Sequence, residues 1–459
     1  MGSFCWPYFD PEYENLNYRI NPPRVSIDND TCSDCTLIKV DSANKHGILL
    51  EVVQLLTDLD LTILKAYICS DGGWFMDVFH VTDQLGNKLT DECIIEYIQQ
   101  TLGPKRVLCG REVKTCLGRT VGVQSIAEYT AIELTGTDRP GLLSGISLAL
   151  TNLGCNVVGA EVWTHNMRVA CVVYVTDEST FKPIEDQCRL STIKDQLLEV
   201  LKGKGDIDRK GFKTDFSMGL THTDRRLHQL MFADRDYECS ESLEPSLLDD
   251  NRKPVITIEN CKEKGYSVVN VQCKDRPKLL FDTVCTLTDM QYVVFHASIT
   301  SKHPYAMQEY YIRHMDGCIL DSEDEKHRVI KCLEAAIERR VSEGVVLELC
   351  TSDRVGLLSD VTRIFCENGL SVRRADVKTQ GKKAVNLFYV TDASGNAVDS
   401  EIVEAMRKEI GHTMLQVKDL SHTAKSLPLT AMEKFRFSFG SLLKSQLDRL
   451  SYNFGIMKF

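Results

Sequence analysis

The sequence predicts an α+β protein made of four tandem ferredoxin-like βαββαβ units. The first observation behind this prediction is a motif that occurs four times in the 459 residues: an apolar run, a polar turn that is Asp-Arg-Pro-Gly in its most complete form, and a second apolar run. The second observation is the nearly constant length of chain between each turn and a later Asp. Self-similarity at a fixed spacing indicates repeated structural units, so we expect four copies of one domain.

The repeat is defined by its turns and by the aspartates that follow them. The turns begin at Asn44, Asp138, Asp275 and Asp353. The later aspartates are Asp83, Asp177, Asp316 and Asp392. The spacing from turn to Asp is the same in three copies and two residues longer in the third.

Within each unit the pattern predicts the same elements in the same order. A short apolar strand ends at the turn, and apolar residues at helical spacing follow it, such as Leu142, Ile146 and Leu150. Two strands rich in β-branched and aromatic residues come next, joined by tight turns. A second amphipathic helix follows, for example over residues 91–102 or 324–341. A closing strand completes the unit.

The repeats also predict the domain boundaries. The expected segments are an N-terminal arm (1–35), unit 1 (36–106), a linker (107–124), unit 2 (125–208), a connector with a charged helix (209–265), unit 3 (266–342), unit 4 (344–419) and a C-terminal tail (420–459). In the tail, Phe439, Leu443, Leu447 and Leu450 lie at helical spacing and predict an amphipathic helix.

The composition argues against several classes of protein. The chain carries a net charge of −11, whereas nucleic-acid binding needs clustered Lys and Arg, so no nucleic-acid partner is expected. No apolar run is long enough for a membrane span. The N-terminus MGSFCWPYFDPEYEN lacks the basic and apolar regions of a secretory signal. Eighteen cysteines without such a signal predict reduced thiols in a soluble cytoplasmic or nuclear protein.

At the repeated turns the chain resembles a known family. The strand, the D-R-P-G-L-L turn and the helix are similar to the ACT domain, a small-molecule-binding regulatory module of many amino-acid biosynthetic enzymes. Four such units, preceded by EYENLNYRINPPRVSIDND (12–30) and carrying SDGGWFMDVFHVTD (70–83), resemble the plant ACT domain repeat (ACR) proteins. The resemblance covers nearly the whole chain. It implies a non-catalytic regulatory or sensor protein that binds free amino acids, pairs its ACT units in homo-oligomers, and acts on an unknown protein target.

The strand-to-helix turn supplies the groups that a zwitterionic amino acid needs. Backbone N–H groups at the positive end of a helix dipole suit a carboxylate, a Gly permits close approach, and an Asp accepts a hydrogen bond from an α-ammonium group. Folding alone also explains these residues, because Asp caps helices and Gly turns the chain. The candidate amino-acid-binding residues are Asn44, His46, Gly47, Asp138, Pro140, Gly141, Asp353 and Gly356.

The third turn departs from the pattern. It keeps Asp275, but Lys278 stands where the other three copies have Gly. A cation at a helix N-terminus opposes the helix dipole, and its side chain would fill the pocket or pair with a ligand carboxylate. This turn is therefore not among the candidate sites.

Two other functions fit parts of the sequence. One is a scaffold whose ACT units pair with those of a partner and bind no metabolite. The other is an enzyme related to the bacterial uridylyltransferases, which carry paired ACT domains behind catalytic domains. The chain has no His-Asp dipeptide, P-loop or G-x-S-x-G motif, and four units leave no room for a catalytic domain of usual size. We therefore expect no catalysis.

Two local features are set aside. Cys32-Ser-Asp-Cys35 is a lone CxxC without a second pair, so neither a zinc ribbon nor any other metal or cofactor is expected. A redox function for this pair remains an alternative. HTDRRLHQLMFADRDYE (222–238) collects charges around an apolar helical face, which is typical of a solvated, ion-paired helix.

Overall fold

The structure is a computed structural model, and it describes most of the four repeats. The described ranges are 23–43, 47–71, 74–103, 113–115, 120–121, 129–202, 212–217, 222–238, 253–341, 344–411 and 414–418. The predicted helix of the C-terminal tail lies outside these ranges, as does most of the N-terminal arm. Within them, no helix has the length and apolar character that a membrane span requires.

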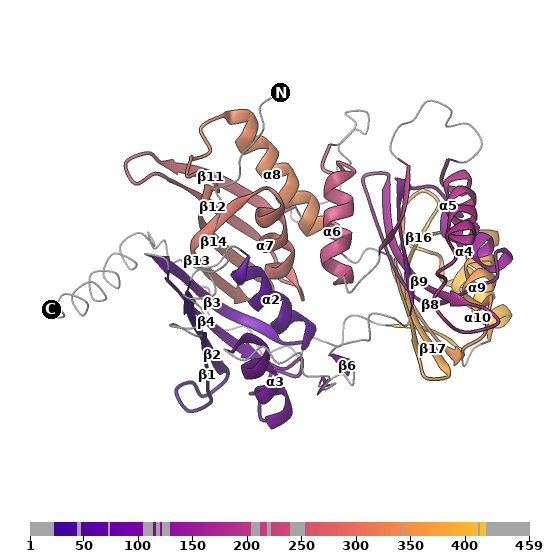
Figure 1. The fold of residues 1–459 in the computed structure, drawn as a ribbon, viewed down its shortest axis with the longest axis horizontal. Coiled ribbons are helices and arrows are strands. Elements are labelled where there is room, and N and C mark those ends of the chain that lie inside the picture. Colours follow the sequence, from indigo (N-terminus) through magenta and orange to yellow (C-terminus); the bar gives the residue numbers. More distant parts are fainter. Residues whose placement is uncertain are drawn as a thin grey trace. The chain divides into compact units, whose positions relative to one another are not determined.

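Units 1 and 3 share one antiparallel sheet of eight strands (Figure 1). Its strands are β1 (Arg24–Asp28), β2 (Thr36–Ala43), β3 (Thr62–Asp71), β4 (Trp74–Thr82), β11 (Val255–Cys261), β12 (Tyr266–Lys274), β13 (Tyr292–Lys302) and β14 (Tyr305–His314). Their order across the sheet is β1-β2-β4-β3-β13-β14-β12-β11. The helices are α2 (Ile48–Asp58), α3 (Glu92–Leu102), α7 (Leu279–Asp289) and α8 (Glu323–Glu338).

Units 2 and 4 share a second antiparallel sheet of eight strands. Its strands are β7 (Thr130–Thr137), β8 (Cys155–His165), β9 (Arg168–Asp177), β10 (Lys213–Ser217), β15 (Val345–Ser352), β16 (Leu370–Gln380), β17 (Lys383–Asp392) and β18 (Leu415–Val417). Their order is β10-β7-β9-β8-β16-β17-β15-β18. The helices are α4 (Leu142–Asn152), α5 (Gln187–Lys202), α9 (Leu357–Glu367) and α10 (Ser400–Ile410). A short ribbon of β5 (Val113–Lys114) and β6 (Thr120–Val121) lies in the predicted linker.

The predicted ferredoxin-like units are confirmed, with one difference in the order of strands. In units 2 and 4 the closing strand follows the second helix, as βαββαβ requires, and pairs with the first strand of its own unit. In units 1 and 3 the same edge position is taken by β1 and β11, which precede the first strand. β1 and β11 each form a hairpin with the strand that follows, since a short loop can join two neighbouring antiparallel strands. The edge strand therefore pairs with the first strand as it does in units 2 and 4. These two units therefore run ββαββα.

Three edge strands of the two large sheets consequently lie outside the predicted units. β1 falls in the predicted arm, while β10 and β11 fall in the predicted connector. The domain boundaries remain predictions, but these edge strands belong to the sheets of units 1, 2 and 3.

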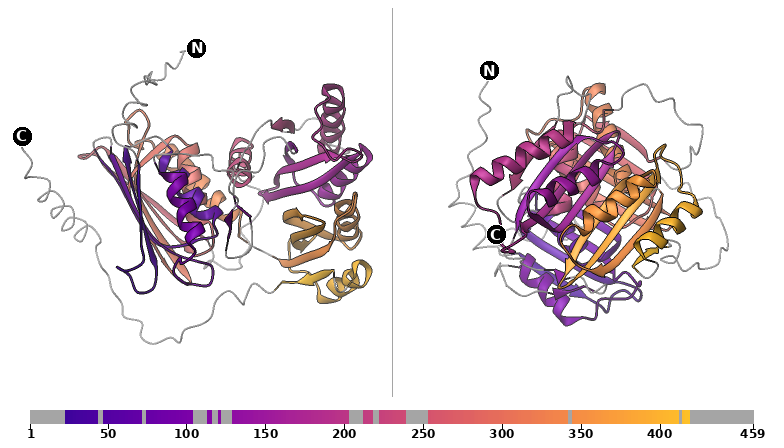
Figure 2. Two further views of the ribbon diagram at one scale, coloured as in Figure 1. Left: turned by 60° about the horizontal axis from the view of Figure 1, so that its bottom comes forward. Right: turned by 90° about the vertical axis from the view of Figure 1, so that its right-hand side faces the viewer.

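The units pair in alternation rather than with their neighbours in sequence. β3 pairs with β13 at the centre of the first sheet, where Ile68 faces Ala297. β8 pairs with β16 at the centre of the second, where Val162 faces Ala375. In each sheet the helices of both units pack on one face over a shared apolar core. The α2 and α7 helices lie side by side on the first sheet (Figure 2).

The charged connector helix is not the solvated helix that the sequence predicts. α6 (Thr223–Ala233) buries Leu227 and Met231 against Trp163 and Val172 of the second sheet. Alternate residues of β9 point to opposite faces, so this cluster lies on the face opposite the helices of units 2 and 4. The charges of α6 are ion-paired as predicted. Asp224 is buried, and the cationic side chains of Lys278 and Arg340 from unit 3 neutralise it.

Candidate functional site

All four strand-to-helix turns use a left-handed residue to start the helix. The values of φ are 83° at Gly47, 78° at Gly141, 65° at Lys278 and 78° at Gly356. Residues with a Cβ adopt this conformation only at a cost of about 1–2 kcal/mol, which explains the Gly in three copies. No side chain caps the helix at any of these residues.

The Asp of each turn lies before the helix and extends the strand. Asp138 donates its backbone N–H to Met167 O at 2.8 Å, and Asp353 donates to Lys382 O at 2.9 Å. Since the N-cap residues are Gly141 and Gly356, these aspartates do not cap the following helices. The folding explanation of the Asp as a helix cap is therefore wrong for these two copies.

The second turn borders a cavity between units 2 and 4. The 450 Å³ of empty space at this position includes open solvent, and the space open to the centre of a water molecule is about 20 Å³. Unit 2 contributes Asp138, Gly141 and the first turn of α4. Unit 4 contributes the end of α9 and the start of β16, including Thr362 and Ser371. A polar turn of one unit therefore faces the helix end of the other.

The fourth turn borders a second cavity of similar size, with the contributions of the two units exchanged. Asp353 and Gly356 now come from unit 4, and the helix end and strand start come from unit 2. The same separation in sequence relates Asp138 to Asp353 and three further pairs of lining residues. These pairs are Ser147 with Thr362, Thr151 with Cys366, and Asn156 with Ser371. The two cavities are thus equivalent sites of one pseudo-symmetric pair.

The cavity hydroxyls are oriented as acceptors. Ser147 Oγ donates to Leu143 O at 2.8 Å, and Thr362 Oγ1 donates to Leu358 O at 2.7 Å. A hydroxyl that donates its proton to the helix backbone keeps lone pairs for another donor. Each cavity therefore presents a hydroxyl acceptor opposite the N-terminus of the other unit's helix.

The two aspartates differ in their surroundings. The Asp138 carboxyl is only 11% exposed, and Arg373 Nη1 of unit 4 lies 3.8 Å from its Oδ2. Burial raises the pKa of Asp138 above its usual range, against the opposing effect of Arg373. Asp353 instead accepts a hydrogen bond from Thr379 Oγ1 at 3.2 Å.

The third turn is covered by the chain's own connector helix. Lys278 Nζ donates to Asp224 Oδ2 of α6 at 2.5 Å, and Arg340 Nη2 lies 3.1 Å from the same oxygen. Burial opposes ionisation of Asp224, but Arg340 and Lys278 outweigh it and hold its pKa well below the usual range. A carboxylate of the protein's own chain therefore pairs with the cation that replaces Gly in this turn.

The start of α6 also contacts both helix ends of the unit 1–unit 3 pair. His222 Nε2 lies 2.6 Å from Asp58 Oδ1 at the end of α2. Arg225 Nη1 donates to Asp289 Oδ2 at the end of α7, at 2.5 Å. Cations at helix C-termini are favoured by the helix dipole. The segment from His222 to Arg225 thus covers the helix ends of units 1 and 3. The equivalent helix ends in units 2 and 4 line open cavities.

The first turn is only partly described. Gly47 adopts the expected left-handed conformation, and no described residue comes within 4 Å of its Cβ position, while Asn44 and His46 lie outside the described residues. Below this turn, Asp77 of β4 is 1% exposed, and its Oδ1 has no hydrogen-bond partner in the described part of the chain. Burial raises the pKa of Asp77 to about 8. In strand register Asp77 corresponds to Asn386, which lines the second cavity.

The structure brings four of the predicted residues to the cavities. Asp138, Gly141, Asp353 and Gly356 line them, while Pro140 is exposed and does not. The residues that the opposing unit contributes, such as Thr362 and Ser147, are not among the predicted site residues. In the sequence, these two residues are recognisable as small hydroxyl residues on an otherwise apolar helix face, at equivalent positions of two repeats. Only the pairing of unit 2 with unit 4 shows which turn each of them faces.

Comparison with known proteins shows similarity along almost the whole chain. A model of the ACR family N-terminal ACT domain matches residues 31–109, and a general ACT domain model matches residues 345–411. The chain is 62% identical over 415 residues to ACT domain-containing protein ACR3 of Arabidopsis thaliana, covering 90% of this chain and 91% of that protein. It is 56% identical over 452 residues to ACT domain-containing protein ACR4 of the same plant, covering 98% of each.

A bacterial enzyme shows a more distant similarity. The bifunctional uridylyltransferase/uridylyl-removing enzyme of Pasteurella multocida is 22% identical over 200 residues, which is 38% of this chain and 23% of the enzyme. The match therefore leaves most of that enzyme without a counterpart here. The two plant proteins are named for their ACT domains and not for a reaction.

Proposed function

Because the chain belongs to the ACR family of ACT domain repeat proteins, we propose that it is a non-catalytic sensor that binds free amino acids in the two cavities between units 2 and 4. The observation that carries this proposal is the pseudo-symmetric pair of cavities. In each, the helix N-terminus and Asp of one unit face hydroxyl acceptors of the other.

The helix N-terminus is proposed to bind the ligand carboxylate. The first turn of α4 or α9 has N–H groups without intrahelical partners, and the helix dipole favours an anion there. Gly141 and Gly356 start these helices without a Cβ. A carboxylate can therefore approach the backbone closely.

The α-ammonium group is proposed to bind between the Asp of the turn and the polar side chains of the opposing unit. In the first cavity, the acceptors are the Asp138 carboxylate and the hydroxyls of Thr362 and Ser371. In the second, they are Asp353 with Ser147 and Asn156. N–H donors together with anionic and neutral acceptors suit a zwitterion better than a simple anion.

The remaining lining predicts which amino acids fit. The first cavity is closed by buried apolar side chains, namely Ile146, Val162, Val169, Phe365 and Leu370. The second is lined by the apolar side chains of Leu357, Leu358 and Val377, and it adds the small Ala384 and the buried amide of Asn386. We therefore expect both cavities to bind aliphatic or thioether side chains, and the second to accept small polar ones as well.

Binding at these positions would regulate through the contact between units. Each ligand touches both members of the pair, so it favours whichever packing of the units it binds more tightly. Because both sites are complete within one chain, ligand binding does not require a homo-oligomer. The signal would pass to a protein target whose identity is unknown.

A thermal-shift screen of the full-length chain against the twenty standard amino acids tests the proposal. A ligand at 100 times its Kd should stabilise the chain by about 2.7 kcal/mol. We expect at least one amino acid to raise the melting temperature, and its effect to fall in Gly141→Ala or Gly356→Ala. If none does so at millimolar concentration, the scaffold function replaces the sensor. Turnover of a nucleotide by the purified chain would instead support the enzyme alternative.

A further inference from the structure

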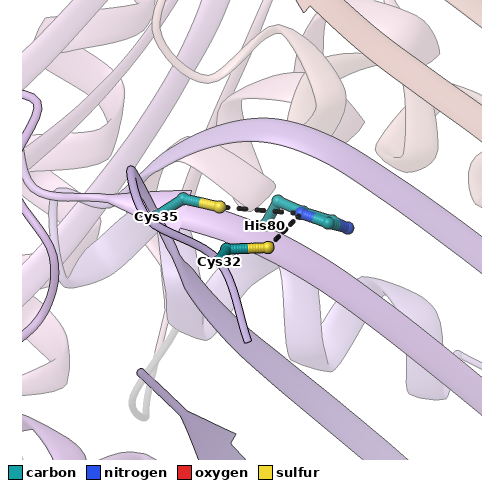
Figure 3. Close-up of side chains that lie close together, drawn as sticks. All are labelled: Cys32, Cys35 and His80. Carbon is teal, nitrogen blue, oxygen red and sulfur yellow. Dashed lines mark hydrogen bonds between the residues drawn. The ribbon is translucent and has the colours of Figure 1, made fainter. Parts of the chain in front are cut away.

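The β1–β2 loop and strand β4 bring together three side chains that bind transition metals (Figure 3). The loop carries Cys32 and Cys35, and β4 carries His80. The distance from His80 Nδ1 is 4.0 Å to Cys32 Sγ and 3.6 Å to Cys35 Sγ. All three potential ligand atoms lie within 4.8 Å of one another.

We propose that Cys32, Cys35 and His80 form a Zn²⁺ site in unit 1. Two thiolates and one imidazole are the donors that zinc prefers, and a CxxC pair with a distant His is common in its tetrahedral sites. Bonds of about 2.3 Å to sulfur and about 2.0 Å to nitrogen at a tetrahedral angle place the two donors roughly 3.6 Å apart. The separations of both sulfurs from Nδ1 are close to this value, so binding needs only small side-chain movements.

The loop that carries the cysteines is held in place by the rest of unit 1. Asp28 accepts hydrogen bonds from the backbone N–H groups of Asp30 and Thr31, at 2.8 and 3.0 Å. Lys88 Nζ donates to the backbone carbonyls of Asn29 and Cys32. These contacts position Cys32 before any metal binds, whereas a lone cysteine pair on an unsupported loop would have to be ordered by the metal.

The donor set also selects the metal. Thiolates and imidazole favour Zn²⁺ over Mg²⁺ and Ca²⁺, which prefer oxygen ligands. Three protein ligands leave the fourth tetrahedral position for water. The metal would join the edge hairpin of β1 and β2 directly to β4, so its expected effect is to stabilise unit 1.

Zinc content is the direct test. The full-length chain, purified without a His-tag under reducing conditions and dialysed, is analysed by inductively coupled plasma mass spectrometry. We expect about one zinc ion per chain, and near-background zinc in Cys32→Ser, Cys35→Ser and His80→Gln. The matched controls are Cys93→Ser and His327→Gln, whose side chains are exposed elsewhere in the described chain. These should retain the zinc of the wild type.

A second readout does not depend on the folding of the variants. Titration of the metal-free wild type with Co²⁺ should produce a thiolate-to-cobalt charge-transfer band and the intense visible bands of tetrahedral Co²⁺, and added Zn²⁺ should remove both. The proposal is overturned if the wild type holds no more zinc than the three variants. It is also overturned if Cys32 and Cys35 form a disulfide in the reduced preparation, or if Co²⁺ gives only the pale spectrum of its aqueous ion.

Discussion

Lys278 of the third turn donates a hydrogen bond to Asp224 of the connector helix, with 2.5 Å between Nζ and Oδ2. The pair joins an internal carboxylate to the one turn in which a cation replaces Gly. The third turn is therefore closed from within the chain, while the second and fourth turns border open cavities.

Replacing Asp224 should unfold part of the protein at lower denaturant concentration. In Asp224→Ala, Lys278 and the 4%-exposed Arg340 lose their shared partner, and breaking a buried ion pair costs about 3–5 kcal/mol. Chemical denaturation followed by fluorescence measures this loss. The exposed Asp195 of α5 is the control, and Asp195→Ala should change the free energy of unfolding by less than about 0.5 kcal/mol. Equal effects of the two substitutions would contradict the buried role of Asp224.

The two turn glycines should respond differently to substitution. A Cβ at Gly141 would lie 2.9 Å from Cys366 Sγ, whereas one at Gly356 would lie 3.6 Å from Thr151 Cγ2. Both have φ of 78°, so Ala would cause the same backbone strain at either position. Only at Gly141 would its Cβ also clash with a neighbouring atom. Ligand affinity at the first cavity should fall by at least about tenfold in Gly141→Ala, equivalent to about 1.4 kcal/mol. The loss in Gly356→Ala at the second cavity should be smaller.

Gly265 provides the matched control for these substitutions. It has φ of 67° and nothing within 4 Å of its Cβ position, in a hairpin away from the cavities. Gly265→Ala should therefore lower stability through backbone strain without changing ligand affinity. Loss of binding in this variant would show that backbone strain alone, and not the cavity, governs the response.

Amino-acid binding at the first cavity should weaken as the pH falls. Burial raises the pKa of Asp138 in the free protein, and a ligand ammonium favours the ionised carboxylate, so binding releases a proton when Asp138 starts protonated. Affinity therefore rises with pH until Asp138 is fully ionised. It decreases as the pH is lowered and Asp138 becomes protonated. Calorimetry across this range should show the dependence in the wild type and its absence in Asp138→Asn. A wild-type affinity without pH dependence would contradict contact between the ligand and Asp138.

Asp77→Asn should stabilise the protein most at the alkaline end of its range. The pKa of Asp77 is about 8 in the fold against an ordinary value of 3.8. The folded state therefore binds more protons than the unfolded state between these values, and stability falls as the pH rises through them. Since Asn mimics the neutral acid, the variant should gain at least about 1 kcal/mol near pH 8 and little near pH 4. The comparison is with Asp195→Asn, whose unfolding should follow the pH dependence of the wild type.

The repeated units can be predicted from the sequence because their signals are local. Apolar residues at helical spacing after each turn identify helices such as α4, and the hairpins follow from tight turns between apolar strands. The left-handed position at the helix start is equally local, since Gly occurs at it in three copies. These features depend on neighbouring residues, so the chain displays them directly.

The features that the sequence does not reveal all depend on distant residues. The pairing of unit 1 with unit 3 and of unit 2 with unit 4 decides which helix end faces which turn. In the sequence, the charges of α6 have the pattern of a solvated helix face. Only the structure shows that Arg340 lies beside Asp224. In the same way, Cys32 and Cys35 form an isolated pair until the sheet register of β2 and β4 brings His80 to them.

The binding stoichiometry of the amino acid identified by the screen tests the central claim most directly. Isothermal titration of the full-length chain should give two ligands per chain, one in Asp138→Asn, one in Asp353→Asn and none in the double variant. Undiminished binding in the double variant, or no binding by the wild type at millimolar concentration, would contradict the claim that the cavities between units 2 and 4 are the amino-acid sites.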